Sequence, residues 1–381
     1  MKTMIIGLSP EYNYPGSFEK WKSNNTYYAS NHGASFICQA LLREFDADYI
    51  DNFSDIPSLK NNYDVCILAL STHIHRKRDI SYLADIVEKL DMKTIAPSLG
   101  MEDYIAASNH IVELHPSVIR LLRLVSERSE AIGVRGPHTA SILQKHGFDN
   151  IIPVGCPSLQ WQLKDNIHIH KNESMTKPLI VYHRTMCSYA QEAMKESTIL
   201  GQDFLDEVVF TNNRNNDNLL HQQEMSQYLK FDDYKTVLGI IHRNGIFPNR
   251  YKLWFDIIGA HDFVIGARLH GCIAALIQGV PAVLVPRDLR MLEIADFYDI
   301  PTASIEDIQK KSIRQIYDEV DFSNFIKTHK DRYKNYYDFL EKNKLVHKLR
   351  RPSLHDDGSL EVFLKKGSLK EVSLKLTFNF S

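Results

Sequence analysis

At 381 residues the chain is long enough for two or three domains of about 150 residues each. Its composition, 44% hydrophobic and 24% charged with few glycines and prolines, is that of a folded globular protein and excludes disordered and collagen-like classes. The 45 basic and 47 acidic side chains give a net charge of −2, so the chain lacks the overall basic field that a nucleic-acid-binding protein would carry.

Targeting and redox signals favour a cytoplasmic protein. The N-terminal apolar run is too short for a signal peptide, and the most apolar stretch, 271–285, falls short of the ~20 residues of a membrane-spanning helix. The five cysteines are odd in number and set among apolar neighbours, which indicates buried free thiols rather than a zinc framework. The basic cluster 342–351 is either a solvated helix face or a peripheral contact with the inner face of the membrane.

Short apolar runs alternate with amphipathic patterns in the first half of the chain, which predicts βαβ units and a parallel sheet. We expect strands at 3–8, 48–50, 64–70, 93–96, 131–134 and 151–154, and helices at 33–45, 81–90, 116–125 and 137–146. The polar stretch 165–177 then interrupts the pattern and is typical of a linker.

The same alternation restarts after the linker. We expect strands at 179–182, 207–210, 263–265 and 282–285, and helices at 219–229, 251–258, 269–278 and 291–297. A long polar helix dotted with aromatic residues is expected at 322–349, packing back across both domains. Strict alternation at 360–380 predicts a β-hairpin that either seals an edge of the fold or contacts another subunit, so an oligomer stays open.

The predicted fold is therefore α/β, with two Rossmann-like domains at 1–170 and 171–320. A cleft is expected between them. Residues 321–381 would supply the crossing helix and the β tail.

The most informative segment is Gly266-Ala-Arg268-Leu-His270, which follows an apolar strand and opens an Ala-rich helix. This turn is expected at the carboxyl edge of a parallel sheet, where ligands bind. Arg268 offers a planar fork for a carboxylate or phosphate, the helix N-terminus favours an anion, and His270 is a candidate proton donor. The alternative is a structural salt bridge that caps the helix.

This segment resembles the signature of the polysaccharide pyruvyl transferase family, a Gly-x-Arg-x-His element before an Ala-rich helix and a Gly-x-Pro turn. Two further stretches are similar to the family: the strand ending in Val134-Arg135 with its helix and the following strand to Ser158, and the early turn Asn31-His-Gly33. The resemblance covers roughly residues 30 to 300 and rests on short motifs.

The resemblance implies two Rossmann-like domains arranged as in GT-B glycosyltransferases, with the first on the acceptor side and the second on the donor side. It also implies transfer of pyruvate from phosphoenolpyruvate onto a sugar of a surface-polysaccharide precursor, lipid-linked or nucleotide-linked, as a ketal. Arg135 and Arg268 would clamp the donor across the cleft, and His270 would protonate its methylene carbon or bind its phosphate. The scheme needs no metal and no cofactor.

Other polar residues follow predicted strands and are candidates for substrate binding. Arg287 and Arg290 lie where the family often has a lysine, His183 and Arg184 end the first strand of the second half, and His73 follows a buried strand. Two segments depart from the family pattern. The glycine-rich turn expected at 71–75 contains Ser71, His73 and His75, and 96–100 keeps only part of its pattern, which places the acceptor side in question.

Weaker patterns favour structural roles. The pairs His73-x-His75 and His168-x-His170 have metal-compatible spacing but no carboxylate or thiol partner in sequence, and Asp46-Ala-Asp48 is interpreted as a solvated turn. The chain has no Gly-x-Gly-x-x-Gly fingerprint, no Walker loop and no Gly-x-Ser-x-Gly elbow. Two rival functions remain: a GT-B glycosyltransferase with a nucleotide-sugar donor, and a non-enzymatic family member that binds a glycan or a partner.

Overall fold

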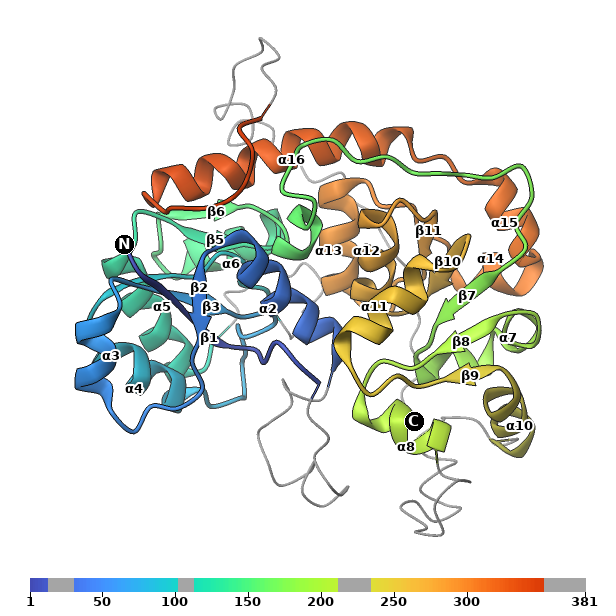
Figure 1. Ribbon diagram of the computed structural model, residues 1–381, viewed down its shortest axis with the longest axis horizontal. Coiled ribbons are helices and arrows are strands. Elements are labelled where there is room, and N and C mark those ends of the chain that lie inside the picture. The colour runs from blue at the N-terminus through green and yellow to red at the C-terminus, as the bar shows by residue number, and fades with distance from the viewer. Residues whose placement is uncertain (13–30, 102–112, 212–233, 353–381) are drawn as a thin grey trace.

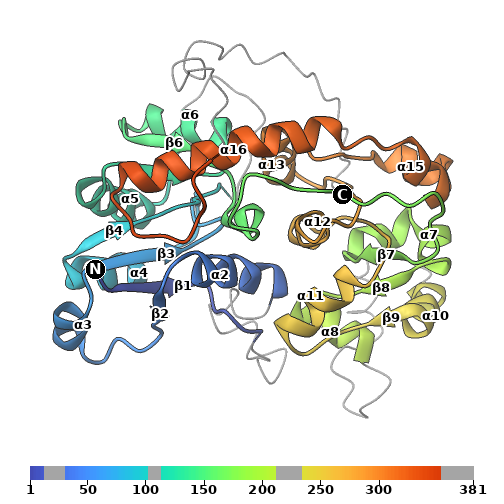
Figure 2. The ribbon, with the colours of Figure 1, turned by 45° about the horizontal axis from the view of Figure 1, so that its top comes forward.

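The computed structural model describes residues 1–12, 31–101, 113–211 and 234–352. Two parallel sheets lie side by side, one built from the N-terminal half of the chain and one from the C-terminal half, each with helices packed against it (Figures 1 and 2). The predicted α/β fold with parallel sheets is confirmed.

The N-terminal sheet has the strand order β2-β1-β3-β4, with all pairs parallel. A second parallel pair, β5-β6, continues it, because the amide of Gly133 donates to the carbonyl of Ala96 and the amide of Leu99 donates to that of Gly133. The strands are β1 (Thr3–Gly7), β2 (Ala47–Tyr49), β3 (Val65–Ala69), β4 (Lys93–Ile95), β5 (Ile132–Val134) and β6 (Ile151–Pro153). The helices are α2 (His32–Glu44), α3 (Ile56–Asn62), α4 (Ser81–Leu90), α5 (Pro116–Arg128), α6 (Pro137–Lys145) and the 3₁₀ helix η1 (Pro157–Gln160).

The C-terminal sheet has the order β11-β10-β7-β8-β9, again all parallel. Its strands are β7 (Pro178–Val181), β8 (Thr198–Leu200), β9 (Gly245–Ile246), β10 (Phe263–Gly266) and β11 (Ala282–Leu284). The helices are η2 (Arg184–Ser188), α7 (Gln191–Lys195), α8 (Phe204–Thr211), α10 (Tyr234–Asn244), α11 (Tyr251–Gly259), α12 (Leu269–Ile277), α13 (Leu289–Tyr298), α14 (Ile305–Lys310) and α15 (Ile313–Glu319). Strands β3 and β10 are apolar and buried along their whole length, as expected of parallel sheets covered by helices.

One predicted strand is wrong: residues 207–210 lie in α8. The carboxylate of Asp203 accepts the amide of Asp206 at 3.0 Å, which starts the helix, and Phe204 and Val208 are buried one turn apart on its inner face. Two described strands were not predicted from the sequence: β8, which ends four residues before the first residue of α8, and the two-residue β9. The expected helix at 219–229 and the hairpin at 360–380 lie outside the described residues.

The long helix α16 (Ser323–Lys342) runs along one side of the molecule and contacts both halves (Figure 1). It ends at Lys342, before the expected limit at 349. Tyr336 donates its hydroxyl to the buried carboxyl of Glu44 in α2 at 2.9 Å, and Arg332 donates to the carbonyl of Phe297 in α13 at 2.6 Å. Its buried aromatic stripe therefore joins the core of both sheets, which agrees with the helix expected to pack across them.

Within the described residues, no helix is long and apolar enough to cross a membrane.

Candidate functional site

Most of the predicted site residues follow the carboxyl ends of strands. In the C-terminal sheet the strand order reverses between β7 and β10, which is the switch point at which open parallel sheets bind ligands. Gly266 of β10 pairs with Val181 of β7 and with Leu284 of β11, so the three strands end at one level. The residues that follow these three ends are His183, Arg184, Arg268, Arg287 and Arg290.

Gly266 makes the turn after β10 sterically feasible. Its φ is +157°, and a Cβ atom at this position would lie 2.4 Å from the carbonyl oxygen of Val181. Any side chain would therefore push β10 away from β7. This close approach explains the glycine that opens the Gly-x-Arg-x-His segment.

Arg268 is held by groups of the protein itself. Its Nε donates to the carbonyl oxygen of Tyr182 at 2.9 Å, and its Nη2 donates to Asp203 at 2.6 Å and to Asp206 at 2.7 Å. Burial raises the pKa of the Asp206 carboxyl, and the charge of Arg268 opposes that rise. A buried pair of this kind is costly to break from one side, because the remaining carboxylate loses its counter-charge. Direct contact between Arg268 and a donor stays a prediction.

The predicted turn at Asn31 contacts the segment that contains Asp203, the partner of Arg268. Asn31 caps α2, since its Oδ1 accepts the amide of Gly33 at 2.8 Å and the side-chain amide of Gln202 at 3.0 Å. Its backbone also forms a β-bridge with Asp203. A Cβ atom on Gly33 would come within 2.9 Å of the Cβ of His270, so only glycine allows α2 to approach α12 this closely. The turn therefore positions His270 from the opposite half of the molecule.

His270 lies in the first turn of α12, and its Nε2 is 3.6 Å from the Sγ of Cys156, which follows β6. Burial, together with the positive charge of Arg135, lowers the pKa of His270 to about 3. The imidazole is therefore neutral at physiological pH. It is a group that can donate one proton but carries no charge of its own.

Arg135 differs from Arg268 in that no carboxylate of the described residues is paired with its guanidinium. It directly follows β5, its backbone amide donates to the carbonyl of Leu99, and its side chain lies against Gly100, where a Cβ atom would meet Cδ at 2.5 Å. The residue is 4% exposed. Its Nε and Nη2 are buried and have no hydrogen-bond partner within the described part of the chain. Its charge acts on both His270 and His73, lowering the pKa of each.

A second group of arginines follows β7 and β11. Arg290 donates to Asp288 at 2.7 Å, and Arg287 donates through Nε to the carbonyl of Ala267 at 3.0 Å. Burial, followed by the positive charges of Arg268, Arg290 and Arg184, lowers the pKa of Arg287 to about 10. Arg287 and Arg290 thus both lie near the carboxylate of Asp288 at the start of α13, at 3.7 and 2.7 Å.

The two remaining predicted histidines are both buried beside strand ends. His183 caps η2 and accepts the amide of Thr185 at 3.3 Å. His73 accepts the amide of Ser71 through Nδ1 at 3.0 Å, and burial lowers its pKa well below the usual range. Since Nδ1 accepts, the neutral ring of His73 carries its proton on Nε2. His73 follows β3, beside the point where the strand order of the N-terminal sheet reverses.

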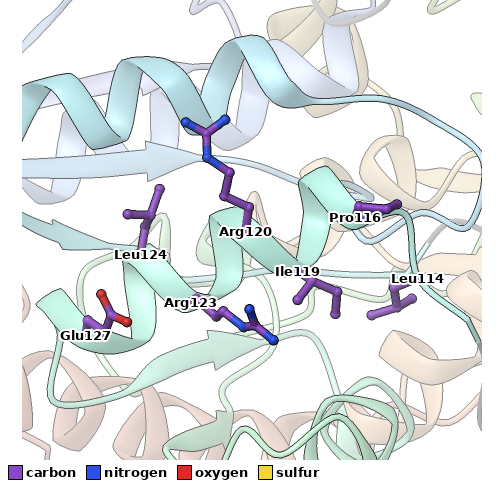
Figure 3. A pocket seen from close by; sticks show the side chains of 7 residues that line it. All are labelled: Leu114, Pro116, Ile119, Arg120, Arg123, Leu124 and Glu127. Carbon is purple, nitrogen blue, oxygen red and sulfur yellow. The ribbon is translucent and has the colours of Figure 1, made fainter.

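Other features lie apart from these residues. In the described ranges no group of three or more histidine, cysteine, aspartate or glutamate side chains could hold a metal ion. A surface hollow runs along α5 and is lined by none of the predicted site residues (Figure 3). Its lining residues are Leu114, Pro116, Ile119, Arg120, Arg123, Leu124 and Glu127. Arg120 in this hollow is paired with Asp85 and Glu88, so its charge is compensated.

The structure brings together residues that the sequence analysis did not connect. Cys156 was predicted only as a buried thiol, yet it contacts His270, 114 residues away. Glu293 of α13 was not singled out, and its carboxylate accepts the amide of Thr139 at 2.7 Å and its hydroxyl at 2.8 Å, at the N-terminus of α6. The position of Cys156 directly after a strand is the signal that could have found it.

Solved structures offer a distant likeness only. UDP-GlcNAc 2-epimerase from Neisseria meningitidis is 13% identical with a TM-score of 0.44, covering 90% of this chain and 99% of that one. S. aureus MnaA is 10% identical with a TM-score of 0.41, covering 90% and 94%. UDP-N-acetylglucosamine 2-epimerase from Rickettsia bellii is 9% identical with a TM-score of 0.43, covering 90% and 95%. No curated protein matches the sequence.

A family model gives a firmer result. The model described as polysaccharide pyruvyl transferase matches residues 31–288, more than half of the chain. The match begins at Asn31 and ends just after Arg287, so it includes Arg135, His270 and every described strand except β1.

Proposed function

Because the chain belongs to the polysaccharide pyruvyl transferase family, we propose that it moves the pyruvyl group of phosphoenolpyruvate onto a sugar of a surface-polysaccharide precursor. The product is a cyclic ketal, in which one carbon of the pyruvyl group bonds to two sugar oxygens. We further propose that residues 1–170 form the acceptor side, residues 171–320 the donor side in a GT-B-like arrangement, and residues 321–381 the crossing segment and tail.

The observation that carries the proposal is the buried guanidinium of Arg135. A buried cation without a counter-ion is unfavourable, so its surroundings favour a ligand that supplies negative charge. Two adjacent nitrogens, Nε and Nη2, lack partners among the described residues, and such a pair is suited to a carboxylate. Phosphoenolpyruvate carries a carboxylate, and we assign that group to Arg135.

The phosphate of the donor is assigned to the arginines that follow β7 and β11. Arg184, Arg268 and Arg290 all act electrostatically on Arg287, and such a concentration of positive charge favours an anionic ligand. Arg268 joins the same group electrostatically, and we propose that it supports the site through Asp203 and Asp206. His183 would orient η2 beside this group.

The chemistry needs two proton movements. A proton must add to the methylene carbon of the donor, which leaves a cationic carbon for a sugar hydroxyl to attack. A second hydroxyl then displaces phosphate and closes the ketal ring. The two hydroxyl protons balance the reaction, since one matches the proton added to carbon and the other leaves with phosphate. We assign the first proton to His270, whose neutral ring must receive a proton from elsewhere as it gives one up.

The acceptor is assigned to the edge of the N-terminal sheet. His73 lies there as a buried neutral imidazole, and Asn31 holds α2 in place between the halves. A lipid-linked or nucleotide-linked sugar is the proposed acceptor.

The test is release of phosphate from phosphoenolpyruvate by the purified protein, with polyprenyl-diphosphate-linked and UDP-linked sugars as acceptors. We expect release only when a suitable acceptor is present. His270→Gln should reduce it by about 100-fold or more, whereas Arg120→Gln on the surface of α5 should retain it. Full turnover by His270→Gln would remove that residue from the proposal.

Thermal stability separates the proposal from a nucleotide-sugar glycosyltransferase. A ligand at 100 times its Kd stabilises the folded state by about 2.7 kcal/mol. We expect this shift with phosphoenolpyruvate. Stabilisation by UDP or CMP and none by phosphoenolpyruvate would favour the glycosyltransferase, and sugar binding without turnover of either donor would favour a glycan-binding protein.

A further inference from the structure

The thiol of Cys156 links His270 to a buried hydroxyl. Its Sγ is 3.6 Å from His270 Nε2 and 3.0 Å from Ser158 Oγ. Cys156 and Ser158 are both fully buried. The three side chains therefore form a short line of polar contacts that ends on the ring of His270, beside the uncompensated guanidinium of Arg135.

The local backbone fixes where this thiol lies. Gly155 precedes it with φ +82°, and a Cβ atom there would lie 2.3 Å from the ring of Tyr298, so α13 packs directly on this turn. Tyr298 donates its hydroxyl to the carbonyl of Val154 at 3.2 Å. Pro157 follows the thiol and opens η1. The thiol is thus held by the end of β6, by η1 and by α13.

Ionisable side chains from three helices of the described structure interact with this thiol. Tyr298 from α13 and Tyr336 from α16 act on it electrostatically, and burial raises the pKa of both, so both are neutral at physiological pH. His270 from α12 is the group in contact, and Arg135 acts through His270.

We infer that Cys156 is a positioning residue for His270: its S–H donates to Nε2, which places the ring proton on Nδ1 and replaces that proton when His270 gives it to the donor. The replacement of the proton given to the donor rests on the proposed function. The position of the ring proton on Nδ1 does not depend on any reaction.

A neutral imidazole needs such a partner in order to act as an acid. If Nδ1 lost its proton alone, the ring would become an anion, which is strongly disfavoured in a buried site. With Cys156 in contact, the S–H bond breaks and an N–H bond forms at Nε2, while the N–H bond at Nδ1 breaks and a C–H bond forms on the donor. The protons then return through the ring: the first sugar hydroxyl gives its proton to Nδ1 as its oxygen bonds to the pyruvyl carbon, and the proton on Nε2 returns to the thiolate.

A thiol is better suited to this role than a hydroxyl, because sulfur loses a proton more readily than oxygen. Serine at this position would keep a hydrogen-bond donor for Nε2 but would be a poor source of a proton. Alanine would provide neither. The two substitutions therefore separate the tautomer from the proton supply.

The experiment combines nitrogen NMR of the labelled His270 ring with steady-state kinetics for Cys156→Ser and Cys156→Ala. We expect a protonated Nδ1 and an unprotonated Nε2 in the wild type and in Cys156→Ser, and loss of this signature in Cys156→Ala. Both variants should lose about 100-fold in kcat, with KM for phosphoenolpyruvate within about 3-fold. Cys66→Ala, which removes a buried thiol in β3, is the matched control and should keep both the signature and kcat.

Two results would overturn the inference. A protonated Nε2 in the wild type would show that the thiol does not donate to the ring. Unchanged kcat in both Cys156 variants would show that the thiol supplies no proton. If the wild type fails to turn over phosphoenolpyruvate with any acceptor, the proposed function fails, and the NMR signature still decides the positioning of His270.

Discussion

Arg135 and Arg268 occupy comparable places in the two halves of the molecule and differ in their partners. Each follows a buried strand of a parallel sheet, and they are 4% and 8% exposed. Arg268 has two carboxylates and a carbonyl oxygen within 2.9 Å, whereas two nitrogens of Arg135 have no partner among the described residues. A buried arginine with carboxylates of its own stabilises the fold, and one without them is suited to a ligand.

The surroundings of the two arginines strengthen this contrast. Arg135 acts on His73 and His270, two neutral histidines from different halves of the molecule. Arg268 acts on Asp206 and on Arg287. Among the described residues, no carboxylate is therefore paired with Arg135, whereas Arg268 is paired with two.

The largest expected effect on stability is that of Arg268→Gln. The substitution leaves Asp206 buried without its cation, and we expect a loss of about 3–5 kcal/mol in the free energy of unfolding. Urea denaturation measures this value. Adding Asp206→Asn should recover part of the loss, and a single variant as stable as the wild type would contradict the structural role of the ion pair.

Glu44 is a third buried ionisable residue, and it too has a polar atom without a hydrogen-bond partner among the described residues. It therefore tests whether such an atom is by itself evidence for a bound ligand. Its Oε1 has no partner in the described structure, yet it faces α16, and burial raises its pKa well above the usual range. The folded protein thus keeps Glu44 protonated to a higher pH than the unfolded chain, which ionises it from about pH 4.3 upward. Its contribution to stability is complete below that pH and falls as the pH rises toward the folded pKa.

We therefore expect Glu44→Gln to be more stable than the wild type at neutral pH and equally stable near pH 4. The difference should grow by about 1.4 kcal/mol per pH unit until the folded pKa is reached. Denaturation series at several pH values measure this slope. A constant difference at all pH values would show that Glu44 is ionised in the folded protein.

The smallest expected effect on stability is that of Arg135→Gln. Removing a buried charge that has no counter-ion should leave the free energy of unfolding unchanged or raise it, within about 1 kcal/mol. The same denaturation assay applies. A loss comparable to that of Arg268→Gln would show that Arg135 is held by protein groups and is not reserved for a ligand.

Much of the fold could be predicted from the sequence, because parallel strands and their helices leave clear apolar patterns. The helix expected at 81–90 has those limits in the structure, and the strand expected at 64–70 contains β3. The failure at 207–210 has a physical cause. Its valines favour a strand, but the helix is decided by the Asp203 cap and by burial of Phe204 and Val208 one turn apart.

The sequence offers candidate-site residues only where they lie in a recognisable motif. Arg135 and His270 are candidates because their motifs follow predicted strands, and Asn31 because of the early Asn-x-Gly turn; their roles stay predictions. The partners that decide their roles are distant in sequence: Asp203 lies 65 residues from Arg268, and Cys156 lies 114 residues from His270. Such pairs are set by how the two sheets pack together, and no local pattern encodes them.

The most direct measurement is calorimetric titration of phosphoenolpyruvate into the wild type, Arg135→Gln and Arg120→Gln. If the guanidinium of Arg135 receives the donor's carboxylate, Arg135→Gln should bind at least about 100-fold more weakly, consistent with loss of a buried charge-assisted contact. Arg120→Gln, which alters an already paired surface arginine, should bind like the wild type. Equal affinity in the wild type and in Arg135→Gln would contradict the account.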